Sequence, residues 1–177
     1  MLMQTPDPLT LKEALPDFRR STHIFLPIND CRAPNLPQGG SHWSLLLVSV
    51  LDRIAFHYDS LYPSNEVAAE HCFRQFQTLL GRQMRYVNLR DSPQQHNGSD
   101  CGIYVCVEMK ELLKRLLKKD SHEQISMSMR GTNIDAVRAR KMMTSLIDEF
   151  RKEGRRSMSR SRSPSGASGR SPPRVGD

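Results

Sequence analysis

Three short polar stretches contain residue types that could act together in covalent catalysis: residues 39–43, 57–60 and 95–102. They supply a histidine at 42, an aspartate at 59 and a cysteine at 101, which are the parts of a thiol nucleophile with an oriented base. Each has an ordinary structural interpretation as well, because a cysteine before a helix usually packs as a small hydrophobe. A histidine beside a tryptophan usually packs, and an aspartate at a strand end usually caps a turn. Only their combination indicates catalysis.

Cys101 lies where a polar loop enters a strongly apolar helical pattern, predicted over Gly102–Lys119. Unpaired backbone N–H groups and the positive end of the helix dipole lie near the first residue of a helix. This placement favours the thiolate, which is the reactive form of cysteine. Gly102, directly behind it, would let the chain run close to a substrate backbone.

His42 and Asp59 lie at the two ends of a predicted antiparallel hairpin. Its strands are Trp43–Leu51, an apolar run that suits burial on both faces, and Arg53–Tyr58. The start of the first strand then lies beside the end of the second, so Asp59 can hold one imidazole nitrogen and leave the other for Cys101. Gln95, six residues before the cysteine, can donate its amide to a developing oxyanion.

Other elements follow from periodicity and from helix stop signals. We predict a strand at His23–Ile28, a loop at Asn29–Gly40, a helix at Glu66–Leu80 capped by Ser64 or Asn65 and ended by Gly81, a strand at Met84–Leu89, and a last helix over about Asn133–Phe150.

Charge and composition divide the chain into three regions. Residues 1–22 are expected to be a loosely structured lead-in, residues 23–150 a single domain, and residues 151–177 a disordered basic tail rich in Ser, Arg and Pro. The tail has eight basic and two acidic residues, and so it carries +6 of the net charge of +7. No nucleic-acid-binding fold is therefore expected, although an RNA-associated role driven by the Ser-Arg tail is a remaining alternative.

The four cysteines form no CxxC pair, and neither they nor the histidines have the spacing of metal ligands. No metal or cofactor is expected. No signal peptide and no membrane-spanning apolar run is present in the sequence, which favours the reducing cytoplasm or nucleus. Cys72 and Cys106 fall on apolar helical stripes and are expected in the core.

Residues about 20–119 resemble the Ulp/sentrin-specific cysteine protease family. The resemblance is carried by the order His42, Asp59, Gln95, Cys101, by the intervals between them, and by the His42–Trp43 pair. The stretches most similar to the deneddylase branch are residues 24–30, 39–46 and 93–105.

This resemblance implies an α+β papain-like fold, with a small mixed or antiparallel sheet packed on the helix that bears the nucleophile. It implies a peptidase that cleaves after the C-terminal Gly-Gly of a ubiquitin-like modifier, either Nedd or SUMO. The implied partners are the modifier and its conjugates, such as neddylated cullins, and the implied state is a monomer without membrane contact. Trp43 would be one wall of a tunnel that admits only glycine, although packing in the core is its plainer interpretation.

Members of the family begin well upstream of this Met1 and carry a second tryptophan opposite the first, whereas this sequence has one. The domain is therefore expected to be truncated at its N-terminus relative to the family, with exposed apolar surface as a result. Two alternatives to a deneddylase follow: a SUMO-specific protease, and a catalytically impaired protein that binds a ubiquitin-like modifier.

Overall fold

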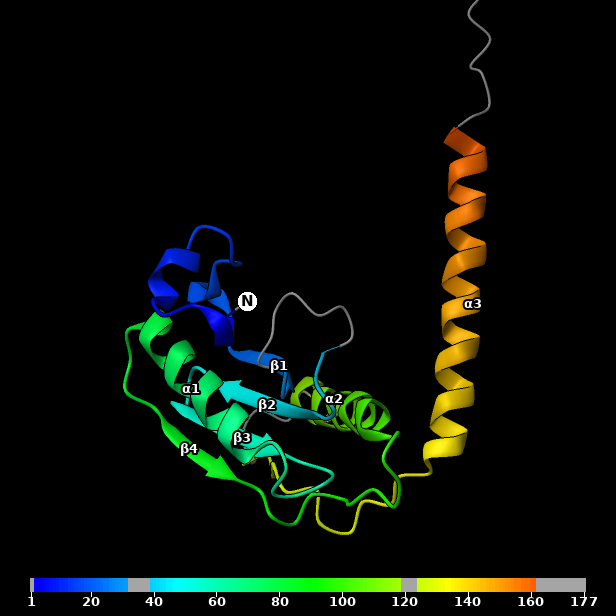
Figure 1. Cartoon of the computed structure of the whole chain (residues 1–177). Helices are drawn as coiled ribbons and strands as arrows, with labels where there is room; N and C mark the ends of the chain where they lie inside the picture. The colour runs from blue at the N-terminus through cyan, green and yellow to red at the C-terminus, as the bar shows by residue number, and fades with distance from the viewer. Residues whose placement is uncertain (1, 32–38, 119–123, 162–177) are drawn as a thin grey trace, which may run out of the picture. The chain divides into compact units, whose positions relative to one another are not determined.

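The computed structural model describes residues 2–31, 39–118 and 124–161. The chain forms two compact units, Met1–Ala139 and Arg140–Asp177. The first unit contains a four-stranded sheet with the order β1-β2-β3-β4, and the second contains most of the long helix α3 (Figure 1). No described helix is both long and apolar enough to cross a membrane.

The sheet is mixed, as the family resemblance implied. Its strands are β1 (His23–Asn29), β2 (Trp43–Ser49), β3 (Ile54–Tyr58) and β4 (Arg85–Asn88). The first three pair antiparallel, and β4 runs parallel to β3. The predicted hairpin is confirmed, since Leu45 pairs with Tyr58 and Ser49 with Ile54.

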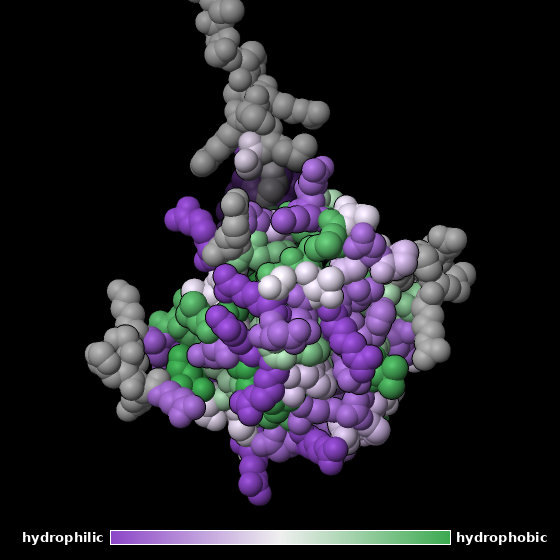
Figure 2. All heavy atoms as spheres, turned by 90° about the vertical axis from the view of Figure 1, so that its left-hand side faces the viewer, coloured by the Kyte–Doolittle hydropathy of each residue, from purple (hydrophilic) through white to green (hydrophobic). Residues whose placement is uncertain are grey.

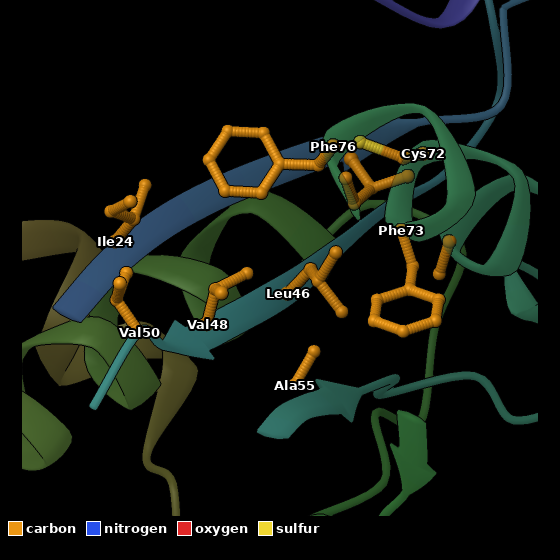
Figure 3. Packing of buried hydrophobic residues seen from close by; sticks show 10 residues of the cluster. Ile24, Leu46, Val48, Val50, Ala55, Cys72, Phe73 and Phe76 are labelled. Atoms are coloured by element: carbon orange, nitrogen blue, oxygen red, sulfur yellow. The ribbon is translucent and has the colours of Figure 1, made fainter. Parts of the chain in front are cut away.

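Two helices cover the two faces of the sheet. The apolar run of β2 is buried on both sides, and its alternate side chains meet different partners. Leu46 and Val48 pack with Phe73 and Phe76 of α1 (Glu66–Leu80), as Figure 3 shows. Leu45 and Leu47 pack instead with Val105 and Leu112 of α2 (Cys101–Leu117). The fold is therefore α+β, with the helix that begins at Cys101 packed directly on the central strand.

The predicted span of α1 is confirmed, and so is its stop signal. Gly81 adopts the left-handed conformation at φ 63° and donates its N–H to the carbonyl of Thr78. The predicted cap is wrong: Asn65 precedes the helix but makes no side-chain capping bond. Its side chain is used elsewhere, as the site shows below.

Residues 2–22 are more regular than the predicted loose lead-in. They form three short 3₁₀ helices, at Leu2–Gln4, Pro8–Leu11 and Phe18–Arg20. The ring of Phe18 lies 5.3 Å from that of Phe76, edge to face, and Gln75 donates to the carbonyl of Thr5. Apolar burial and polar contacts with α1 thus hold this segment.

The last helix, α3 (Ala136–Ser161), differs from the predicted span of 133–150. It continues past Phe150 into the predicted disordered tail, because residues such as Arg151, Lys152 and Glu153 are good helix formers. Ala139 is buried, but large apolar side chains of this helix are exposed: Val137, Met142, Leu146, Ile147 and Phe150. Residues 162–177 of the predicted tail lie outside the described residues.

Hydrophobic residues also reach the surface of the first unit. On the side drawn in Figure 2 they form separate patches between hydrophilic residues. Trp43, Leu61 and Val67 are among the exposed large apolar side chains. The expectation that such surface results from a truncated N-terminus stays a prediction.

Candidate active site

The hairpin of β2 and β3 brings His42 and Asp59 together, as predicted. His42 Nε2 lies 2.6 Å from Asp59 Oδ1, and both residues are almost fully buried. An ionised carboxylate only accepts hydrogen bonds, so Nε2 is the donor and Nδ1 is the imidazole nitrogen left for another partner. Asp59 therefore fixes both the tautomer and the plane of the imidazole.

Two backbone groups complete the environment of Asp59. The N–H of Leu61 donates to Oδ1 and the N–H of Asn65 to Oδ2, each at 2.9 Å. Burial raises the pKa of Asp59, but the hydrogen bonds from His42, Asn65 and Leu61 outweigh it and leave that pKa below its usual value. The carboxylate is therefore ionised and oriented.

The backbone of His42 is held from the other side by Asp30. Asp30 Oδ1 accepts from the N–H groups of Ser41 and His42, at 2.6 and 3.0 Å. Burial raises the pKa of Asp30, but the hydrogen bonds from Ser41 and His42 outweigh this effect, so the pKa lies below its usual value. Gly40 has φ 88°, and a Cβ there would collide with the side chains of Asn29 and Asp30. This turn therefore requires glycine.

Cys101 is the first residue of α2 and is 7% exposed. The preceding Asp100 makes no side-chain capping bond to the helix. The sulfur of Cys101 therefore lies at the positive end of the helix dipole.

Hydrogen bonds tie the loop before Cys101 to the chain that follows Asp59. Gln94 Nε2 donates to the Asp59 carbonyl at 2.8 Å, and the Gln95 N–H donates to the Ser60 carbonyl at 2.7 Å. Tyr104, one turn into α2, donates its hydroxyl to the Gln94 carbonyl at 3.1 Å. The start of α2 is thereby anchored to the end of β3, where Asp59 meets His42.

The Gln95 side chain is buried and oriented by its neighbours. Its Oε1 accepts from the Ser60 hydroxyl at 2.7 Å, and its Nε2 donates to the Asn97 carbonyl. An amide nitrogen carries two hydrogens, so the second is available for an oxyanion. This arrangement is compatible with the role predicted for Gln95.

Trp43 is 44% exposed, so its plainer interpretation as a core residue is wrong. Trp43 is the first residue of β2 and pairs with Asn29 of β1. Its side chain lines a hollow of about 280 Å³ together with Cys31 and Cys72. A half-exposed indole beside the candidate histidine is compatible with a wall for a substrate chain.

Two of the other cysteines differ in burial. Cys72 is buried as predicted, and burial raises the pKa of its thiol to about 12. Cys106 is exposed, so the prediction that it lies in the core is wrong. The buried stripe of α2 runs through Cys101, Tyr104 and Glu108, and Cys106 lies off that stripe. Among the described residues no group of three His, Cys, Asp or Glu side chains could hold a metal ion.

Sequence reasoning missed the residues that support the site. They are polar residues in turns and strand ends, whose partners lie far away in the chain: Asp30, Ser44, Ser60, Asn65 and Gln94. Asp30, Ser44 and Gln94 lie within the stretches that resemble the deneddylase branch, and Ser60 lies within the polar stretch 57–60, but no role was predicted for any of them. Asn65 was predicted only as a helix cap.

The chain is similar to known proteins in both sequence and fold. The family described as "Ulp1 protease family, C-terminal catalytic domain" matches residues 8–153. NEDD8-specific protease 2 of Schizosaccharomyces pombe is 36% identical over 147 residues, which cover 82% of this chain and 35% of that protein. The chain spans about a third to a half of the length of the curated relatives it matches.

Two solved structures share the fold. The Xanthomonas campestris effector protein XopD bound to ubiquitin superposes with a TM-score of 0.58 at 22% identity, covering 81% of this chain and 72% of that one. The SUMO protease Ulp1 with its catalytic cysteine oxidised to a sulfenic acid gives a TM-score of 0.51 at 25% identity, covering 78% and 57%.

Proposed function

The chain belongs to the Ulp1 protease family, and from this membership we propose that it is a cysteine peptidase acting on a ubiquitin-like modifier, with Nedd as the preferred one. The observation that carries the proposal is the buried 2.6 Å bond between His42 and Asp59. It gives an imidazole of defined tautomer, and Gln94, in the loop that leads into Cys101, donates to the backbone carbonyl of Asp59.

In the first step His42 Nδ1 takes the proton of the Cys101 thiol. The thiolate attacks the carbonyl carbon of the modifier's last glycine, and the carbonyl oxygen becomes an oxyanion. The second amide hydrogen of Gln95 and the N–H groups at the start of α2 are the donors for that oxyanion. Asp59 stabilises the imidazolium that has formed.

In the second step the imidazolium gives its proton to the leaving amine, and the C–N bond breaks. A thioester between Cys101 and the modifier remains. His42 then takes a proton from a water molecule, the resulting hydroxide attacks the thioester, and the modifier leaves with a free carboxylate while Cys101 regains its proton. The same steps serve precursor trimming and isopeptide cleavage.

The preference for Nedd rests on the relatives. Two proteins from S. pombe that match over about four-fifths of this chain are named NEDD8-specific proteases. The proposal extends to Nedd conjugates such as neddylated cullins as substrates, to a monomeric state, and to the cytoplasm or nucleus as location. SUMO is the alternative modifier, since a solved SUMO protease shares the fold.

The test uses Nedd and SUMO probes with an electrophile in place of the last glycine carboxylate. Under reducing conditions the full chain is expected to form a covalent adduct with the Nedd probe at Cys101, and Cys101→Ser is expected to form none. Cys106→Ser, which removes an exposed thiol on the same helix, is the matched control and should react like the parent. A faster reaction with the SUMO probe would contradict the preference.

A second arm separates binding from catalysis. Nedd binding that survives Cys101→Ser, with no adduct in the parent, would identify a binding protein instead of a peptidase. Because the chain spans about a third of the S. pombe relative, the assay is repeated on a chimaera extended with that relative's preceding residues. An adduct only in the chimaera would show that the site is competent and that binding surface is lacking.

A further inference from the structure

A second group of polar side chains is buried beside the His42–Asp59 pair, on the face of the sheet covered by α1. Ser44 on β2, His57 on β3 and Asn65 before α1 are fully buried, and Asn88 at the end of β4 is half-buried. We call these four hydrogen-bonded residues the buried polar chain. The proposed mechanism uses none of these four residues. Polar groups are costly to bury unless they are satisfied, so their presence in this face of the core needs an explanation.

In the buried polar chain each residue donates a hydrogen bond to the next, from Asn65 through Ser44 and His57 to Asn88. His57 Nδ1 lies 3.1 Å from the side-chain oxygen Oδ1 of Asn88, which only accepts, so Nδ1 carries the ring hydrogen. Burial lowers the pKa of His57, so the ring is neutral and its Nε2 is an acceptor. The Ser44 hydroxyl, 3.0 Å away, therefore donates to Nε2 and accepts from Asn65 Nδ2 at 3.0 Å.

Asn65 connects the buried polar chain to the candidate active site. Its Nδ2 also lies 3.4 Å from the His42 carbonyl, and its backbone N–H donates to Asp59 Oδ2 at 2.9 Å. One residue thus contacts the backbone of the base and the carboxylate that orients it.

The conformation of Asn65 indicates that this contact is its main role. Asparagine is among the best residues for capping a helix, and Asn65 directly precedes α1. Its amide nevertheless makes no capping bond and points to Ser44 and to the Ile28 and His42 carbonyls. Local rules of sequence are most often broken where function requires it.

We propose that His57 is a positioning residue for the peptidase reaction. It holds Ser44, Ser44 holds the amide of Asn65, and Asn65 sets the position of the His42 backbone relative to the Asp59 carboxylate. This inference rests on the proposed function for its consequence in catalysis. The positioning itself concerns only the geometry of His42 and Asp59.

The experiment compares His57→Phe, which removes both ring nitrogens, with His57→Gln, which keeps one acceptor and one donor. Ser44→Ala removes the hydroxyl that joins His57 to Asn65, with a smaller change of side-chain volume. His23→Gln is the matched control, because His23 lies on β1 and is not part of the buried polar chain. Two quantities are measured on the full protein at near-neutral pH. They are the NMR signal of the His42 Nε2–H, which a short bond to a carboxylate shifts to low field, and the rate of iodoacetamide alkylation at Cys101.

His57→Phe and Ser44→Ala are expected to lose the low-field signal and to slow alkylation by up to about 100-fold. His57→Gln and His23→Gln are expected to keep both. A folded His57→Phe that retains the signal and the parent's rate overturns the proposal. If that variant does not fold, the same result in Ser44→Ala overturns it.

The two proposals fail separately. A parent protein that shows the low-field signal and loses it in Ser44→Ala supports the positioning role. If Cys101 in that same parent is alkylated no faster than the exposed Cys106, the proposed function is contradicted, and the positioning role stands.

Discussion

Replacing Glu108 by glutamine is expected to stabilise the folded protein, and to do so more strongly as the pH rises from about 5 to about 8. Glu108 lies on α2, two turns after Cys101, and is 1% exposed. Neither of its carboxyl oxygens has a hydrogen-bond partner among the described residues. The carboxyl group is thus buried in its neutral form, as its surroundings cannot stabilise a charge.

The magnitude follows from the shifted ionisation. Burial, and to a smaller extent the charge of Asp59, raises the pKa of Glu108 from 4.5 to about 8. Between these values the folded state keeps a proton that the unfolded state releases, so the free energy of unfolding falls as pH rises. One proton corresponds to about 1.4 kcal/mol per pH unit, so the parent loses about 4 kcal/mol between about pH 5 and pH 8. A glutamine side chain has nearly the same shape as glutamate but does not ionise, so Glu108→Gln should not lose this stability as pH rises.

The assay is urea unfolding followed by circular dichroism at several pH values. The parent should show the falling stability, and Glu108→Gln should show a flatter profile over that range. Glu111→Gln is the matched control on the same helix, because Glu111 is partly exposed and pairs with Lys114 at 2.9 Å. Its effect should stay below about 1 kcal/mol. Parallel pH profiles of the parent and Glu108→Gln would refute the reasoning.

Three further predictions concern the site. Asp59→Asn should lower the turnover of a Nedd precursor by about 10³- to 10⁴-fold, because the amide can present the wrong group to His42. The pKa of Asp59 is lowered in the folded state, so the parent should lose stability as pH falls through that pKa. The variant should lose less stability in the same acid titration. Gln95→Ala should lower turnover by about 100- to 1,000-fold while iodoacetamide still alkylates Cys101 at the parent's rate, and an equal loss in both measurements would contradict an oxyanion role. Gly40→Ala should lower the free energy of unfolding by about 1–3 kcal/mol and slow adduct formation with the Nedd probe, because a Cβ cannot fit beside Asn29, and unchanged urea and adduct curves would show that the turn adapts.

The elements of this fold were predictable where apolar residues repeat with a regular period. The predicted span of α1 equals the observed one, and β2 and β3 were predicted with the tight turn between them. Buried positions recur with the period of the helix or strand, so apolar residues repeat in the sequence with that period. The proximity of His42 and Asp59 followed from that hairpin, because the start of β2 lies beside the end of β3 in an antiparallel pair. The end of α3 was missed, because helix propensity continues past the last apolar residue.

Other features depend on contacts between distant parts of the chain. Periodicity assigned Cys106 to an apolar stripe, but the packing of α2 on β2 decided which stripe is buried. Asn65 is an ordinary helix-capping residue in the sequence, and only the approach of Ser44 and the His42 carbonyl turns its amide away from the helix. The sequence by itself determined the elements and the chemical types at the site. Which polar groups meet there was decided by the tertiary structure, because a hydrogen bond depends on position in space and leaves no periodic pattern along the chain.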